Sequence, residues 1–211
     1  MKKILIATLL IAAYAVSARA TGLESLESFV KTVKTAHTDF TQVVTVPAKE
    51  GQAARNKTSS GVFEFARPGR FRFVYKKPFE QTIVADGQTL WLYDVDLNQV
   101  TARKQAQALG ATPAALIASA ADLKALQADF VLKADADSEG LEWVLATPKA
   151  KDSALQTVRV GFKTGELAVL EILDSFGQKS SLRFNGFKAN ATIDAAAFQF
   201  TPPTGADVIR Q

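Results

Sequence analysis

Side chains that commonly carry out catalysis are scarce in this chain of 211 residues, which contains one histidine and no cysteine. The histidine, His37, lies at the end of a predicted helix, where its ring would interact favourably with the helix dipole. Because there is no second histidine and no thiol, the usual nucleophilic triads and zinc sites lack the residues they need. The motifs GxSxG and HExxH and a phosphate-binding loop are also absent from the sequence. The sequence therefore predicts a protein that is not an enzyme.

Acidic residues offer a second kind of chemistry, because carboxylate and amide oxygens are ligands for calcium. Asp94, Asp96 and Asn98 alternate along the chain as they do in a calcium loop. Such a loop also needs a glycine at its sixth position and a glutamate at its end, and both are missing here. Nothing in the sequence points to the paired carboxylates of a glycoside hydrolase. We therefore expect neither a metal nor a cofactor.

The first 20 residues have the features of an export signal. Lys2 and Lys3 precede an apolar run over residues 4–16, and small residues stand at positions 18 and 20. The run is shorter than the roughly 20 residues that span a membrane. We expect cleavage after Ala20, export, and a single domain over residues 21–211. Since the chain has no cysteine to carry a diacylglycerol at the cleavage site, we expect the exported protein to be free in solution.

The net charge of the chain without its first 20 residues argues against a nucleic-acid partner. Three of the 25 basic residues leave with that segment, so the excess over the 21 acidic residues nearly disappears. A protein without a clustered basic surplus lacks the electrostatic feature that phosphate backbones require.

The remaining chain begins with a predicted helix and continues mainly in strands. Apolar residues at 23, 26, 29, 30 and 33 share one helix face, and Thr21 with Glu24 forms a capping box. This helix either packs on a sheet or partly covers an apolar cavity. Alternating or apolar runs predict strands at residues 62–65, 71–75, 81–85, 89–93, 99–103, 130–132, 141–146, 155–162, 166–173, 179–187 and 198–200.

Local turn signals connect the strands, which predicts an antiparallel meander. Pro68-Gly69 and Asp86-Gly87 stand at two hairpin turns, and Pro202-Pro203 should end the last strand. The alanine-rich segment 104–129 interrupts the pattern with two short helices, capped by Thr112 and by Asp122. It is either a simple crossover or an insertion with a purpose. We predict a barrel-like sheet of ten or eleven strands with three helices, whose interior is solid or hollow.

Several motifs together resemble the family of periplasmic outer-membrane lipoprotein carriers, LolA. The longest is RPGRFRFVYKKPFEQTIVADGQTLWLYDVDLNQVT at residues 67–101. Shorter matches are TP at 112–113, LEWVLATPK at 141–149, DSFGQ at 174–178 and FQFTPPTGADVI at 198–209. The resemblance implies a mainly β (α+β) fold, in which an unclosed antiparallel β-barrel of about eleven strands and a three-helix lid enclose an apolar cavity.

The resemblance also implies a function without catalysis. A carrier of this family is a periplasmic chaperone that binds the acyl chains of lipoproteins released from the inner membrane and delivers them to an outer-membrane receptor. Its expected partners are acylated lipoproteins, an inner-membrane lipoprotein-releasing ABC transporter and that receptor, and we expect a monomer. The receptor shares the fold but is itself lipidated, so the missing cysteine favours the carrier.

Site residues follow from the same resemblance. Arg67 occupies the place of the arginine that latches the lid by hydrogen bonding to its backbone. The acyl-chain cavity would be lined by Phe71, Phe73, Ile83, Trp91 and Leu92. The apolar underside of the lid would include Leu116 and Ile117.

Two other functions remain as alternatives. One is a periplasmic lipid or lipoprotein sensor that uses the same half-barrel to regulate a membrane protein, although such sensors usually carry a second domain. The other is a periplasmic hydrolase, which turnover of a substrate by the purified protein would reveal.

Overall fold

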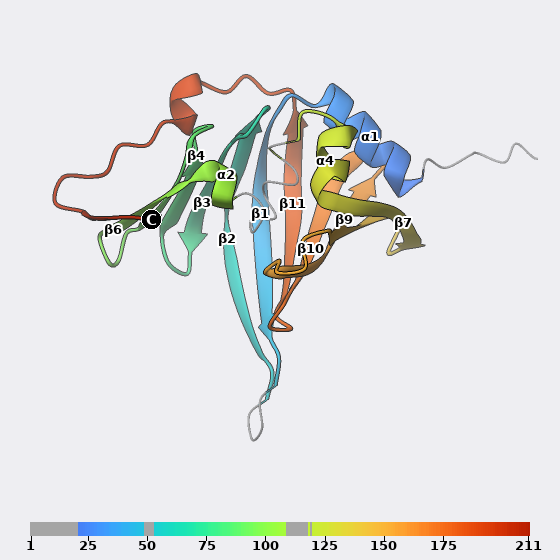
Figure 1. The fold of residues 1–211 in the computed structure, drawn as a ribbon, viewed down its shortest axis with the longest axis horizontal. Coiled ribbons are helices and arrows are strands. Elements are labelled where there is room, and N and C mark those ends of the chain that lie inside the picture. Colours follow the sequence, from blue (N-terminus) through green and yellow to red (C-terminus); the bar gives the residue numbers. More distant parts are fainter. Residues whose placement is uncertain (1–20, 49–52, 109–117, 119) are drawn as a thin grey trace, which may run out of the picture.

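The computed structural model describes residues 21–48, 53–108, 118 and 120–211, and these form one sheet of twelve strands with helices at one end (Figure 1). The strand order is β12-β6-β5-β4-β3-β2-β1-β11-β10-β9-β8-β7, so β1 lies in the middle. The strands are β1 Thr35–Val46, β2 Arg55–Ala66, β3 Arg70–Lys77, β4 Gln81–Ala85, β5 Thr89–Asp94, β6 Gln99–Lys104, β7 Phe130–Ser138, β8 Leu141–Pro148, β9 Leu155–Lys163, β10 Glu166–Asp174, β11 Lys179–Ala189 and β12 Asp207–Arg210.

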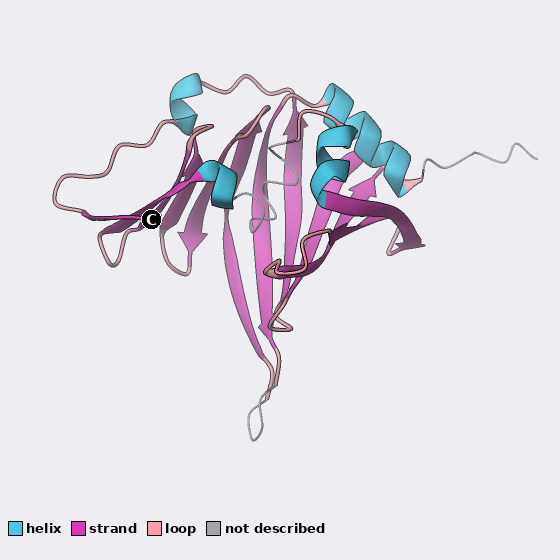
Figure 2. Cartoon of the chain, viewed as in Figure 1, coloured by secondary structure: helices cyan, strands magenta, loops and turns pink. Residues whose placement is uncertain are grey.

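The sheet curls without closing, because the edge strands β7 and β12 stand at opposite ends of the strand order. Figure 2 shows the helices gathered at one end, while β1 and β2 extend past them at the other. The helices are α1 Gly22–Thr32, α2 Gln105–Ala108, α4 Leu123–Asp129 and the 3₁₀ helix η2 Ala195–Phe198. No helix among the residues described is long and apolar enough to cross a membrane.

Side chains on each strand alternate between two faces of the sheet. We call the face on which α1 packs the concave face and the opposite one the convex face. The ring of Phe29 in α1 lies 6.2 Å from that of Phe65 and 5.6 Å from that of Phe162, measured between centroids. Both partners are fully buried. One helix therefore joins strands from the two halves of the sheet, β2 and β9.

The N-terminal helix has the predicted capping box. The amide of Glu24 donates to the Thr21 hydroxyl, and the amide of Thr21 donates to the Glu24 carboxylate at 2.8 Å. The cap of the later helix is also as predicted, since the Asp122 carboxylate accepts from the amide of Ala125. The position of His37 was predicted wrongly, because α1 already ends at Thr32 and His37 lies within β1.

The C-terminal segment also differs from the prediction. Residues 198–200 do not form the expected strand, since Phe198 ends the 3₁₀ helix η2, and the two prolines do not end the sheet. After them the chain adds β12, which pairs with β6 in parallel, Val208 opposite Val100. The sheet therefore has twelve strands and is not wholly antiparallel.

The predicted three-helix lid is not matched. Among the described residues, α1 and α4 lie against the sheet at the end shown in Figure 1, whereas the single turn of α2 continues β6. Thr112, Leu116 and Ile117 fall outside the described residues, and so do the signal segment and its cleavage site.

Candidate functional site

The concave face carries a continuous array of aromatic side chains near the helices. Phe63 and Phe73, opposite each other on β2 and β3, stack with centroids 4.2 Å apart. Phe40 on β1 meets Phe73 edge-on at 5.4 Å. All three are buried, with exposed fractions of 5% or less. Because neighbouring strands contribute equivalent positions, the aromatic surface runs across the strand direction.

Four of the five predicted cavity residues lie on this face. Strand register places Phe73 opposite Ile83 and Ile83 opposite Leu92, so these three form one row across β3, β4 and β5. Phe71, two residues before Phe73, shares its face and is fully buried. The row continues the aromatic array toward β6.

The prediction for Trp91 was wrong. Adjacent residues on a strand point to opposite faces, so Trp91 and Leu92 cannot both face the same cavity. The Trp91 ring lies on the convex side, 5.5 Å from Phe200 of the C-terminal segment. Its indole nitrogen donates to Asp86 at 3.0 Å. Trp91 therefore holds the chain that crosses the outer surface.

The Asp86 carboxylate organises the neighbouring hairpin. It accepts hydrogen bonds from the amides of Gln88 and Thr89 at 2.8 and 2.7 Å, as well as from Trp91. Burial raises the pKa of this carboxyl, but the hydrogen bonds from Thr89, Trp91 and Gln88 outweigh it, so the pKa lies below 3.8. The predicted Asp86-Gly87 turn is present, and Gly87 adopts the positive φ of 104° that glycine tolerates.

Arg67 connects the sheet to the segments that cover it. Its Nε donates to the carbonyl of Val33, just after α1, at 2.9 Å, and its Nη1 donates to the carbonyl of Ala120 at 2.8 Å. The guanidinium also lies over the rings of Phe29 and Phe65, about 5 Å from each centroid. Burial lowers the pKa of Arg67 to about 10, so the side chain stays protonated near neutral pH.

A backbone contact lies beside these side-chain bonds. The amide of Gly69, in the same β2–β3 turn, donates to the carbonyl of Ala118 at 3.2 Å. Gly69 also accepts a 2.6 Å bond from the side chain of Gln105, which in turn accepts from the amide of Gly87. The buried Gln105 thus ties two turns together, a role that its place in the sequence did not reveal.

Toward the end of the sheet away from the helices, the concave face is hollowed by two pockets. One of about 430 Å³ includes Tyr75, Gln81 and Asp94 in its lining, and we call it the Tyr75 pocket. The other, of about 300 Å³, includes Ile172 and Ser180, and we call it the Ser180 pocket. Gln42 and Val44 line both, so β1 forms the ridge between them.

Polar side chains cross this ridge and were missed from the sequence. The hydroxyl of Tyr75 donates to Gln42 Oε1 at 3.0 Å, and Gln42 Nε2 donates to Ser180 Oγ at 2.7 Å. We call Gln42, Tyr75 and Ser180 the polar seam. Burial raises the pKa of Tyr75 to about 12, which keeps its hydroxyl neutral. Alternation could have placed Gln42 on the face of Phe40, but not beside Ser180.

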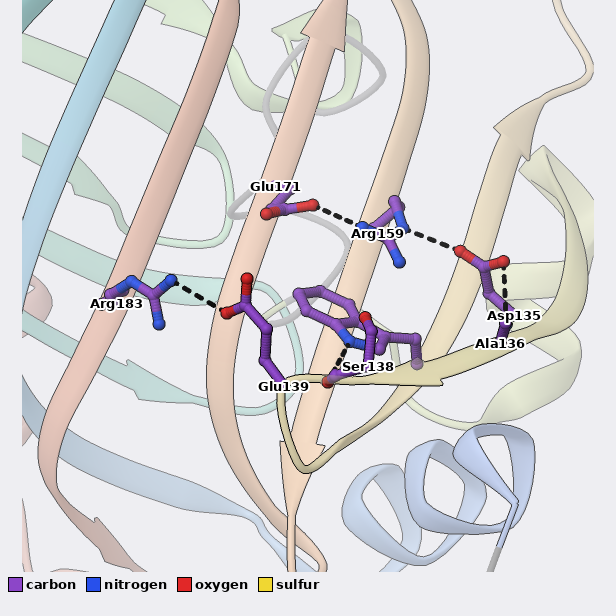
Figure 3. A network of polar contacts seen from close by, with 8 residues as sticks. Asp135, Ala136, Ser138, Glu139, Arg159, Glu171 and Arg183 are labelled. Carbon is purple, nitrogen blue, oxygen red and sulfur yellow. Dashed lines mark hydrogen bonds and ion pairs between the residues drawn. The ribbon is translucent and has the colours of Figure 1, made fainter.

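The convex face has a pocket of different character, also of about 430 Å³. Its lining includes Arg159, Glu171 and Lys179. Arg159 lies 4.2 Å from the ring centroid of Trp143 and bridges two carboxylates, Asp135 at 2.7 Å and Glu171 at 2.8 Å (Figure 3). The charges of Arg159 and Glu171 in this lining are therefore paired with each other.

The residues considered for catalysis or metal binding take part in ordinary contacts. His37 pairs with Glu64 at 2.8 Å on the convex face. Asp94 accepts from the amide of Leu97 within the β5–β6 turn. In the described part of the chain, no group of three histidine or acidic residues is arranged to hold a metal ion.

Comparisons with known proteins agree on one family. The family model described as outer membrane lipoprotein carrier protein LolA matches residues 31–201. Proteins named outer-membrane lipoprotein carrier protein are similar over almost the whole length. The one from Albidiferax ferrireducens is 68% identical over 97% of this chain and 98% of its own. The one from Methylibium petroleiphilum is 53% identical over 92% of each.

A solved structure supports the fold alone. An uncharacterized conserved protein from Thermus thermophilus is 14% identical, covers 90% of this chain and 97% of its own, and has a TM-score of 0.50.

Proposed function

The chain belongs to the LolA family of outer membrane lipoprotein carrier proteins, and we propose that its concave face holds the acyl chains of a lipoprotein in transit. As a member of this family the protein is a lipoprotein carrier and acts as a chaperone. The observation that carries the proposal is that the concave face holds a buried aromatic array and, away from the helices, two partly apolar pockets beside Val44.

The physical need for a carrier follows from the hydrophobic effect. Moving an acyl chain of about 15 methylenes from a bilayer into water costs on the order of 12 kcal/mol. That is a partition of roughly a billionfold, at ~1.4 kcal/mol for each factor of ten. A lipoprotein with two or three chains therefore needs an apolar surface that travels with it. The protein shields hydrocarbon and breaks no bond, so it needs no catalytic residue.

We propose the same partners and compartment that the sequence led us to expect. The exported chain, cleaved after Ala20, works in the periplasm as a monomer. An inner-membrane ABC transporter supplies the work of loading, and an outer-membrane lipoprotein receptor takes the cargo. The carrier must bind acyl chains less tightly than the receptor does, because otherwise the cargo would not be delivered.

Arg67 is proposed as the latch of the lid, which consists of α4 and the residues directly before it. Two observations support this role: the bond from Arg67 to the Ala120 carbonyl and the neighbouring bond from Gly69 to Ala118. Since both join the β2–β3 turn to the covering segment, they stabilise the closed, empty carrier. Cargo that opens the lid must break them, and their return favours release.

The test is release of newly made, radiolabelled lipoprotein from spheroplasts after addition of the purified protein, residues 21–211. We expect lipoprotein in the supernatant as a soluble complex with the added protein. If lipoprotein stays on the membrane while the folded protein still binds lipid, the carrier function is contradicted and a lipid sensor becomes the better explanation.

A further inference from the structure

The polar seam lies where the aromatic part of the concave face meets the more polar lining of the two pockets. Its three residues come from three strands, Tyr75 from β3, Gln42 from β1 and Ser180 from β11; β1 and β11 are neighbours, and β2 lies between β3 and β1. Within each strand the next residue on the same face toward the helices is aromatic or aliphatic: Phe73, Phe40 and Leu182. A polar group at this depth must be hydrogen-bonded to offset its lost hydration. The three residues meet part of this need through the bonds from Tyr75 to Gln42 and from Gln42 to Ser180.

The bonds within the seam do not use all of its donors. Gln42 has two amide hydrogens and gives one to Ser180, whose hydroxyl hydrogen can turn to another acceptor. Among the residues that the structure describes, neither hydrogen has a further acceptor. The seam is therefore suited to a ligand group that accepts hydrogen bonds.

The position of the seam indicates where the rest of such a ligand would lie. Tyr75 lines the pocket of about 430 Å³, Ser180 lines the pocket of about 300 Å³, and Gln42 lines both. Pockets for small ligands have volumes of about 300–1,000 Å³. A group held at Gln42 thus has a partly apolar pocket on either side.

We infer that the polar seam binds the ester carbonyls of the diacylglyceryl group of a lipoprotein, while the two acyl chains separate into the pockets on either side; this rests on the proposed function. Ester carbonyls accept hydrogen bonds, donate none and carry no charge. A free fatty acid would offer a carboxylate instead. The Tyr75 pocket has Asp94 and Asp96 against the single cation of Lys57, and the Ser180 pocket has Asp174, so each lining has a net negative charge and the neutral ester is the better match.

The test compares two synthetic lipopeptides that differ only in the glyceryl linkage. One carries two palmitoyl chains as esters, and the other carries hexadecyl chains as ethers, which have no carbonyl oxygen. Affinities are measured with the protein of residues 21–211 and with Ser180→Ala and Gln42→Leu. Ser181→Ala is the matched control, since this serine is next in sequence but lies on the convex face. Palmitate is tested in parallel, and thermal unfolding checks that each variant folds.

We expect Ser180→Ala and Gln42→Leu each to weaken binding of the ester lipopeptide by about three- to tenfold, as loss of one hydrogen bond predicts. Their affinity for the ether lipopeptide should not change, and Ser181→Ala should alter neither. An equal loss for both lipopeptides, no loss for either, or a loss confined to palmitate would overturn the inference and leave the carrier function standing. If the unaltered protein binds neither lipopeptide, the proposed function and the inference fall together.

Discussion

Arg67 Nη1 donates a 2.8 Å hydrogen bond to the carbonyl oxygen of Ala120, a residue 53 positions further along the chain. The same guanidinium bonds to Val33 through Nε. One side chain in a hairpin turn therefore contacts both the end of α1 and the segment before α4. Nη2 is buried and has no hydrogen-bond partner among the residues described, so the group depends on the two bonds that it makes.

Replacing Arg67 with leucine should trap the cargo. Hydrogen bonds from a charged group contribute about 1.5–3 kcal/mol each, and their loss weakens the closed, empty carrier. We expect Arg67→Leu to accept lipoprotein but to pass it to a receptor at least tenfold more slowly in a transfer assay. Arg67→Lys, which can keep one bond, should be intermediate. Arg72→Leu removes the same charge from the convex face of β3 and should transfer normally; normal transfer by Arg67→Leu would contradict the latch.

Replacing Phe73 with leucine should weaken both cargo binding and stability, whereas replacing Phe198 with leucine should weaken stability alone. Phe73 and Phe198 are both buried aromatic residues, at 5% and 2% exposure, but Phe73 lies on the concave face and Phe198 packs outside β3. We expect either substitution by leucine to lower the free energy of unfolding by about 1–3 kcal/mol. Only Phe73→Leu should weaken binding of a fluorescent acyl probe, so an equal effect of Phe198→Leu on that binding would count against the assigned face.

Stability in acid should depend on Asp86. Its pKa in the folded protein lies below 3.8, so folding favours the ionised form. The stabilisation is therefore complete above pH 3.8 and is lost as the pH falls through the folded-state value. Urea unfolding measured from pH 6 to pH 2 should show a smaller acid-dependent loss for Asp86→Asn than for the unaltered protein. Trp91→Phe, which removes one of the three bonding partners, should lie between the two, and identical pH dependence in all three would refute the assignment.

The ion pairs of Arg159 should stabilise the edge strand β7. Arg159 joins Asp135 of β7 to Glu171 of β10, with side chains about one-third exposed. Ion pairs at such positions contribute about 0.2–1 kcal/mol each, and salt screens them. We expect Arg159→Leu to lower the free energy of unfolding by about 1 kcal/mol, less in high salt, and to speed amide hydrogen exchange in β7.

Arg183→Leu is the control for that experiment. Arg183 pairs with Glu139 at 3.3 Å, and both side chains are more than half exposed (Figure 3). Its loss should change stability by only a few tenths of a kcal/mol. If the two variants lose equal stability, the geometry of the Arg159 network has no special effect.

Features that depend on neighbouring residues could be predicted from the sequence. The capping box of Thr21 and Glu24 and the turn at Asp86-Gly87 are each formed by residues within four positions of one another. The aromatic run at residues 71–75 was also sufficient to assign Phe71 and Phe73 to one face. In each case the interacting residues are close together in the sequence, so a local sequence pattern was sufficient to predict their arrangement.

Features that depend on strand order could not be predicted from a single chain. Gln42 bonds to Ser180 across 138 positions, and no local signal makes β1 and β11 neighbours. The pairing of β12 with β6 was missed for the same reason, because the two prolines predicted the end of the sheet, whereas β12 follows them. The error for Trp91 is of another kind, because the alternation of side chains along a strand was sufficient to place Trp91 and Leu92 on opposite faces.

The central place of β1 has a consequence for folding. Strands β1 to β6 and strands β7 to β11 are two runs in which each strand pairs with the next, and in the described part of the chain the β1–β11 ladder joins them. Each run can form by successive hairpins, whereas the ladder must close a loop of more than 100 residues, and long-range pairings of this kind form slowly. Until β11 arrives, β1 is an edge strand with open hydrogen-bonding groups beside the aromatic surface, the kind of edge that pairs with other chains. The step that completes the carrier is thus also the step during which the chain is most exposed to aggregation.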